Sequence, residues 1–153
     1  TISQPYTVAF QTQALEIKAG NKVLEIGSGS GYQTSILVSM KAEVYSIERI
    51  YELYKKSKRI LSILNLMPRK IIWEDGYLGS KKDAPFDKIL IAAACVEIPM
   101  NLVQQLKVGG KMIIPIGNQK NQIMNLITRI SKNKIKKTEL GNFLFVPMLT
   151  NKI

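Results

Sequence analysis

Two kinds of hydrophobic pattern alternate along the chain. Short runs of consecutive apolar residues predict strands buried on both faces of a sheet, and longer stretches with apolar residues at helical spacing predict helices. We expect helices over residues 4–17, 31–40, 50–65 and 98–106, and strands over 23–26, 44–47, 70–74, 87–94, 111–116, 122–131 and 134–146. The last two strands should form a hairpin around Asn133, and Gly109-Gly110 should stop the fourth helix. This order predicts an α/β fold, with a mostly parallel central sheet and a C-terminal antiparallel hairpin, in a single domain over residues 1–153.

The most informative local feature is the glycine-rich turn after the first predicted strand. Gly27, Gly29 and Gly31 punctuate this turn just before the next helix. Glycine permits positive φ and close approach of the backbone to a ligand, which would then lie at the helix N-terminus. Glu48 ends the second strand about 20 residues later, where a nucleotide-binding fold places the acid that holds ribose hydroxyls. The pattern predicts an adenosine-bearing cofactor, although glycines after a strand can also be simple turn formers.

Two common nucleotide motifs do not fit this turn. The NAD fingerprint needs its third glycine one position later, where Tyr32 stands, and the Gly-Lys-Ser/Thr ending of a P-loop does not follow. Glu25, inside the end of the first strand, would repel a pyrophosphate. It would suit the ammonium and sulfonium groups of S-adenosylmethionine. The two acids and the three glycines together favour that cofactor.

The residue inventory excludes several classes of chemistry. The chain has no histidine, which excludes Ser-His-Asp and Cys-His catalysis within these residues, and we expect no metal site. A single cysteine, Cys95, excludes an internal disulfide and fits a reducing compartment. The hydrophobic content of 46% is that of a soluble globular protein, and no apolar run is long enough to span a bilayer. No signal peptide is recognised, so we expect a cytoplasmic protein with no membrane partner.

The formal net charge of +11 raises the possibility of a nucleic-acid partner. The basic residues gather at 55–59, 81–82 and 132–137, and lysine far outnumbers arginine, which is the better reader of phosphates and base edges. A solvated lysine-rich surface is therefore favoured over a nucleic-acid interface. We expect a monomer without a nucleic-acid partner.

Further candidate residues follow other predicted strands. Asp75-Gly76, after the third strand, could contact an adenine amino group or form an ordinary turn. Ala92 to Ala94 are small enough to lie beside a cofactor, and they could equally fill the core. Cys95 is expected to be a small buried hydrophobe. Ser3, taken by itself, would be a helix N-cap ahead of Pro5.

The chain resembles the protein-L-isoaspartate (D-aspartate) O-methyltransferases along almost its whole length. The resemblance rests on Thr1-Ile2-Ser3-Gln4-Pro5-Tyr6, Val23-Leu24-Glu25-Ile26-Gly27-Ser28-Gly29-Ser30-Gly31-Tyr32, Val44-Tyr45-Ser46-Ile47-Glu48-Arg49, Asp75-Gly76-Tyr77, Ala84-Pro85-Phe86-Asp87, Ala92-Ala93-Ala94, Glu97-Ile98-Pro99, Leu106-Lys107-Val108-Gly109-Gly110 and Phe145-Val146-Pro147. Many methyltransferases share the glycine loop, whereas the segment that begins at Thr1 is far more specific. The family normally has a helical portion ahead of that segment, so we expect the chain to lack the family's N-terminal part.

The resemblance implies a Rossmann-like methyltransferase that repairs damaged proteins. Such an enzyme transfers a methyl group from S-adenosylmethionine to the α-carboxylate of an L-isoaspartyl residue and leaves S-adenosyl-L-homocysteine. The implied active-site serine is Ser3. The implied cofactor-binding residues are Thr1, Ile2 and Ser3 over the reaction centre, Glu25, Gly27, Ser28, Gly29, Ser30 and Gly31 around the methionine end and the adenosyl group, Glu48 and Arg49 at the ribose, and Asp75 and Gly76 at the adenine.

The chemistry that the resemblance implies agrees with a chain without histidine. A carboxylate is already ionised at neutral pH and needs no general base to attack a sulfonium methyl group. Catalysis would consist mainly of alignment, with Ser3 donating a hydrogen bond or steering the substrate rather than acting as a nucleophile.

Two alternatives remain open from the sequence. One is an RNA or small-molecule methyltransferase on the same fold, since a fold does not fix the substrate. The residues Ala92-Ala93-Ala94-Cys95 do not match the Asn/Asp-Pro-Pro-aromatic motif typical of adenine amine methylation. The other alternative is a catalytically impaired protein that still binds S-adenosylmethionine.

Overall fold

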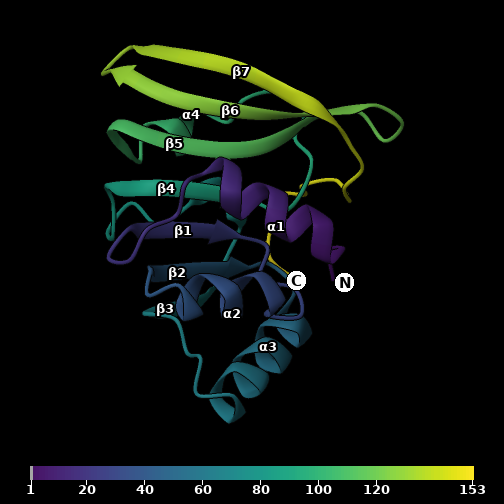
Figure 1. Cartoon of the computed structure of the whole chain (residues 1–153). Coiled ribbons are helices and arrows are strands. Elements are labelled where there is room, and N and C mark those ends of the chain that lie inside the picture. The colour runs from purple at the N-terminus through teal and green to yellow at the C-terminus, as the bar shows by residue number, and fades with distance from the viewer. Residues whose placement is uncertain (1) are drawn as a thin grey trace.

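A seven-stranded sheet forms the centre of the protein, with the strand order β3-β2-β1-β4-β5-β6-β7 (Figure 1). The computed structural model describes residues 2–153. The strands are β1 (Lys22–Ile26), β2 (Glu43–Glu48), β3 (Lys70–Trp73), β4 (Phe86–Ile91), β5 (Leu106–Gly117), β6 (Gln122–Ser131) and β7 (Lys134–Phe143). The first five pair in parallel, whereas β6 runs antiparallel to both β5 and β7. The predicted parallel sheet with a C-terminal antiparallel hairpin is confirmed.

Helices pack on both faces of this sheet. The helices are α1 (Pro5–Ala14), α2 (Tyr32–Ser39), α3 (Tyr51–Ile63) and α4 (Met100–Val103), and residues Gly76–Leu78 form a short 3-10 turn, η1. One core lies under α1 and α2, where Leu37 packs with Val23 and Leu90. The other core lies under α4, where Leu102 packs with Phe86 and Ile89. Consecutive apolar side chains in β1 and β4 therefore pack into the cores on opposite faces of the sheet, as expected for strands that are covered on both sides.

The strand order places a ligand site at the carboxyl ends of β1 and β4. β1 pairs with β2 on one side and with β4 on the other. From β1 the chain adds β2 and β3 toward one edge of the sheet, and from β4 it adds β5 toward the opposite edge, so the order of addition reverses between β1 and β4. In open α/β sheets the crevice at such a reversal is where ligands bind. The glycine-rich turn lies at this point.

Helices α1 and α3 end three and two residues earlier than the sequence pattern suggested. α1 ends at Ala14 rather than at residue 17, and Glu16 has a positive φ of 52°. α3 ends at Ile63 rather than at residue 65, where Asn65 has a φ of 53°. A left-handed backbone conformation cannot continue a right-handed helix, so the positive φ values of Glu16 and Asn65 explain why α1 and α3 end where they do.

The prediction for residues 98–110 was wrong in its boundaries. α4 is a single turn over Met100–Val103, and β5 begins at Leu106 and continues through both glycines. Leu106 pairs with Phe86 of β4, and both side chains are fully buried, so long-range pairing overrides the local helical pattern. The pairing register shifts after Phe86, and Gly109 has a φ of 84°, so the glycines sit at an irregularity within a strand rather than at a helix end.

Strands β4 and β7 each end three residues earlier than predicted. β4 ends at Ile91 and β7 ends at Phe143. Beyond them, Ala94 forms an isolated bridge with Pro147, and the Ala94 N–H donates to the carbonyl oxygen of Val146 at 2.8 Å. The C-terminal segment 144–153 therefore leaves the sheet edge and returns to the carboxyl ends of the parallel strands.

Candidate functional site

The turn between β1 and α2 needs glycine for its backbone path. Gly27, Gly29 and Gly31 all have positive φ values, of 91°, 51° and 86°, which other residues rarely adopt. Gly31 occupies the N-cap position of α2 in the left-handed conformation. The Gly27 and Ser28 N–H groups donate to the carbonyl oxygen of Ile47 at 2.8 and 3.2 Å. The turn is thereby fixed to the end of β2, and the N-terminus of α2 faces the crevice.

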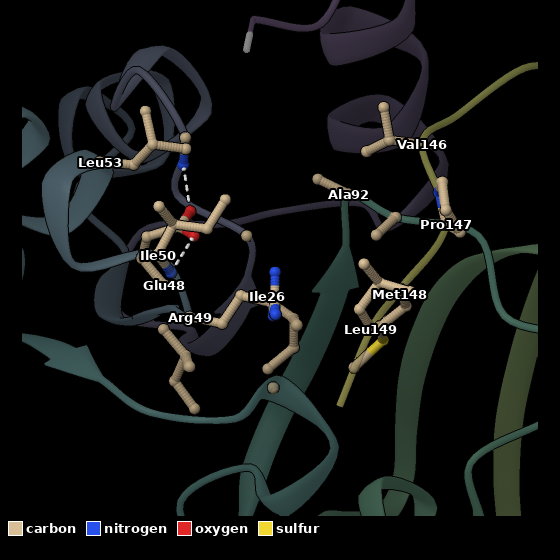
Figure 2. A pocket seen from close by; sticks show the side chains of 15 residues that line it. Ile26, Glu48, Arg49, Ile50, Leu53, Ala92, Val146, Pro147, Met148 and Leu149 are labelled. Atoms are coloured by element: carbon tan, nitrogen blue, oxygen red, sulfur yellow. Dashed lines mark hydrogen bonds between the residues drawn. The ribbon is translucent and has the colours of Figure 1, made fainter. Parts of the chain in front are cut away.

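Glu48 at the end of β2 holds the same turn with its side chain. Its two carboxylate oxygens accept hydrogen bonds from the Gly29 N–H and the Ile50 N–H, both at 2.9 Å (Figure 2). The residue is buried, yet it lines the cavity beside the turn. A carboxylate held by two amides retains lone pairs for further donors, such as a pair of ribose hydroxyls. The predicted positions of the glycine turn and Glu48 meet in this cavity.

A cavity of about 270 Å³ opens between the strand ends and the C-terminal segment. One side is formed by Glu48, Arg49, Ile50 and Leu53, and the opposite side by residues 146–149 (Figure 2). Apart from Glu48 and Arg49, the lining side chains are apolar. Such a lining suits the flat face of an adenine ring, with the carboxylate at one edge.

Ala92 and Ala93 also line this cavity, which supports the interpretation that small residues at the end of β4 lie beside a ligand. Ala94 is buried in the bridge to Pro147. Cys95 is buried too, and burial raises the pKa of its thiol, as expected for a packing residue.

Arg49 lies at the cavity and binds the C-terminal segment. Its guanidinium donates to the carbonyl oxygens of Asn151 at 2.9 Å and Thr150 at 3.5 Å. Its own carbonyl oxygen accepts from the Ile153 N–H at 2.9 Å, and the Tyr51 N–H donates to the Ile153 carbonyl at 2.7 Å. Arg49 therefore closes one wall of the cavity.

Asp75 and Gly76 approach the cavity from the end of β3. The Asp75 carboxylate accepts from the Tyr77 N–H at 2.8 Å and from the Asn151 N–H at 2.7 Å. Gly76 lines the cavity, and a Cβ there would lie 2.5 Å from Cγ2 of Ile26, so only glycine fits without a shift. The Asp75 side chain caps η1 and anchors the C-terminal segment, and its contact with adenine stays a prediction.

Glu25, in β1, is not among the residues that line the cavity. The residue has no exposed surface, and its Oε2 accepts from the hydroxyls of Thr34 at 2.6 Å and Ser46 at 2.7 Å. Burial raises the pKa of Glu25 to about 7, against the lowering effect of these two hydroxyls. The observed contacts join α2 to β1 and β2, and a direct contact of Glu25 with the cofactor stays a prediction.

Ile2 and Ser3 line a second, smaller cavity of about 40 Å³ with Ser28 and Ser30. This cavity shares Gly27, Gly29 and Ala92 with the larger one, so the two are neighbours across the glycine turn. Ser3 does not cap α1, because Gln4 is the N-cap residue and provides no side-chain cap. Thr1 lies outside the described residues.

Several lining residues were missed by the sequence interpretation. Residues 146–149 reach the larger cavity because the chain returns from β7, a path that no local pattern indicates. Gln33 lines the smaller cavity, and its place in the first turn of α2 was the signal that could have identified it.

The residues present fit S-adenosylmethionine. The larger cavity offers an apolar face and a carboxylate, as an adenosyl group requires, and the smaller cavity holds the buried hydroxyl of Ser28, which has no hydrogen-bond partner among the described residues. A buried polar atom without a partner is costly unless a ligand or water supplies one. The glycine turn connects the two cavities.

Fold and site together define a Rossmann-like S-adenosylmethionine-dependent methyltransferase. A family model for protein-L-isoaspartate(D-aspartate) O-methyltransferase matches residues 1–153, and the chain belongs to that family.

The relatives carry the same family name. A protein-L-isoaspartate O-methyltransferase of Christiangramia forsetii is 53% identical over 152 residues, which cover 99% of this chain and 71% of that protein. Its counterpart in Flavobacterium psychrophilum is 52% identical with the same coverage. A Plasmodium falciparum structure, described as a protein-L-isoaspartate O-methyltransferase in complex with S-adenosyl-L-homocysteine, superposes with a TM-score of 0.87 at 29% identity and covers 99% of this chain and 77% of that one. The chain thus spans about 71% of the length of these curated relatives.

Proposed function

We propose that this chain transfers a methyl group from S-adenosylmethionine to the α-carboxylate of L-isoaspartyl residues in damaged proteins, as one domain over residues 1–153. The family match carries the proposal, and the two neighbouring cavities at the glycine turn, one lined by Glu48 and the other by Ser3, support it. Glu48 would hold the ribose hydroxyls, and residues 146–149 would cover the adenosyl group.

When bound, the cofactor supplies an electrophilic methyl group on its sulfonium sulfur. The chain's own residues then have a positioning task, because a carboxylate substrate is ionised at neutral pH and needs no base. Ser3 lines the smaller cavity next to the glycine turn, where its hydroxyl can donate to the substrate carboxylate and orient it. The absence of histidine from the sequence is compatible with this chemistry.

A matched pair of peptides tests the proposal directly. The chain is incubated with methyl-labelled S-adenosylmethionine and either an isoaspartyl peptide or its normal aspartyl counterpart. Base-labile label on the isoaspartyl peptide alone is the expected result. Ser3→Ala should lower the rate, whereas Ser62→Ala, at an exposed position on α3, should not. Measurable cofactor binding without label on either peptide would contradict the proposed substrate.

The proposal includes a monomer in the cytoplasm that acts without nucleic acid. Several lysines are paired with acids across the fold, including Lys107 with Asp87 at 3.0 Å and Lys111 with Glu16 at 3.6 Å. This pairing supports a solvated basic surface. No helix among residues 2–153 has the length and apolar character needed to cross a membrane. Light scattering that gives a dimer mass, or RNA binding with a steep salt dependence, would contradict this part of the proposal.

A further inference from the structure

Gln33 is a buried polar residue to which neither the sequence nor the proposed reaction assigns a role. It lies in the first turn of α2, immediately after the glycine turn, and only 7% of its surface is exposed. Its side chain lines the smaller cavity with Ser3 and Ser28. A glutamine at this depth must find hydrogen-bond partners for both ends of its amide.

Contacts with α1 fix the orientation of the Gln33 amide. The Thr12 hydroxyl donates its single proton to the carbonyl oxygen of Val8 at 2.7 Å. That oxygen can then only accept from Gln33, whose Nε2 lies 3.0 Å away. The NH₂ end of the amide therefore faces α1, and Oε1 is the end left for the cavity.

Oε1 of Gln33 has no hydrogen-bond partner among the described residues, and the same holds for the hydroxyl of Ser28, which is 4% exposed. Two residues of the cavity lining thus each carry a buried polar atom without a partner, and one of these atoms, Oε1 of Gln33, can only accept. The complementary ligand group is a donor, and a compact cation with several N–H bonds would satisfy both atoms at once.

The position of this cavity indicates which end of the cofactor carries that group. The larger cavity suits the adenosyl part, and the two cavities share Gly27, Gly29 and Ala92. A ligand that extends from the larger cavity across the glycine turn would bring its amino-acid end to Ser28 and Gln33. Of the two charged groups at that end, the ammonium donates and the carboxylate accepts. An acceptor-only atom selects the ammonium.

We propose that Gln33, oriented by Thr12, binds the ammonium group of the cofactor's methionine end through Oε1, with the Ser28 hydroxyl as second acceptor. This inference rests on the proposed function, because it requires S-adenosylmethionine as the cofactor. It assigns a side chain beyond the glycine turn to cofactor recognition and sets the orientation of the amino-acid end.

Calorimetric binding of three non-reacting ligands tests the assignment. The ligands are S-adenosylhomocysteine, its analogue with hydrogen in place of the amino group, and 5′-methylthioadenosine, which lacks the whole amino-acid end. Wild-type protein should bind S-adenosylhomocysteine about ten-fold more tightly than the deaminated analogue. Gln33→Met, which keeps the side-chain length and removes one of the two acceptors, should weaken this preference and leave the affinity for 5′-methylthioadenosine unchanged.

Two further variants complete the experiment. Gln33→Glu restores an acceptor and should restore the preference for the amino group. Gln104→Met repeats the glutamine-to-methionine change at an exposed position and should bind all three ligands as the wild type does. A Gln33→Met protein that still prefers the amino group as strongly as wild type would overturn the assignment, and so would an equal loss for 5′-methylthioadenosine. Failure of wild-type protein to bind S-adenosylhomocysteine would instead refute the proposed function.

Discussion

The buried carboxyl of Glu25 should make the stability of this protein depend on pH. Burial raises the pKa of Glu25 from its ordinary value of 4.5 to about 7. At 1.36 kcal/mol per pKa unit, this difference amounts to about 3 kcal/mol. The folded protein holds the proton more tightly than the unfolded chain does. The stabilising contribution is therefore complete below about pH 4.5, and it is lost as the pH rises to about 7.

Glu25→Gln removes this titration while keeping an oxygen that can accept from the Thr34 and Ser46 hydroxyls. Urea unfolding at about pH 5.5 and about pH 8.5 gives the free energy of unfolding at both ends of the sensitive range. Glu25 should account for a loss of about 2 kcal/mol in wild-type protein between these two conditions, and the variant should lack this part of the loss.

An exposed glutamate provides the control for this experiment. Glu52 lies on the surface of α3, where it pairs with Lys55 at 3.0 Å, and Glu52→Gln should reproduce the wild-type pH dependence. Equal losses of stability in the wild type and in Glu25→Gln would refute the reasoning, because they would show that Glu25 does not titrate between these pH values.

Two more predictions concern the hydrogen bonds that shape the larger cavity. Glu48→Ala leaves the Gly29 and Ile50 amides without their acceptor, so the melting temperature should fall and the affinity for S-adenosylhomocysteine should drop at least about ten-fold in calorimetry; unchanged affinity would contradict a role at the ribose. Asp75→Ala removes the acceptor of the Asn151 N–H, so amide exchange at Asn151 should accelerate about ten-fold or more, and wild-type protection in the variant would show that other contacts hold the segment.

The glycine turn and Glu48 were predictable because their requirements are local. Positive φ at Gly27, Gly29 and Gly31 needs glycine, and the spacing to Glu48 follows from one helix between two parallel strands. The turn and this acid meet as expected, since the Gly29 N–H donates to the Glu48 carboxylate. The local sequence was therefore sufficient to predict that the glycine turn and Glu48 lie together.

Other features depend on contacts that local sequence does not encode. The partner of the Asp75 carboxylate, Asn151, lies 76 positions further along the chain, and Arg49 reaches the same segment. The start of β5 was missed because Leu106 pairs with Phe86 of β4, which decides its conformation against the helical pattern around it. The orientation of the Gln33 amide, which leaves its oxygen without a partner, depends on the contact with Thr12 of α1, and no local pattern predicts that contact.

Several of the exposed lysines lie along β7, the last strand of the sheet. β7 has β6 on one side, and its other side is the outer edge of the described sheet, where free amides and carbonyls could recruit a strand from a second molecule. Lys134, Lys136 and Lys137 are exposed along this strand, next to Lys132 in the turn before it. Two such edges repel each other when they approach, so these lysines oppose fibril-like growth of the sheet and favour colloidal stability in a crowded solution.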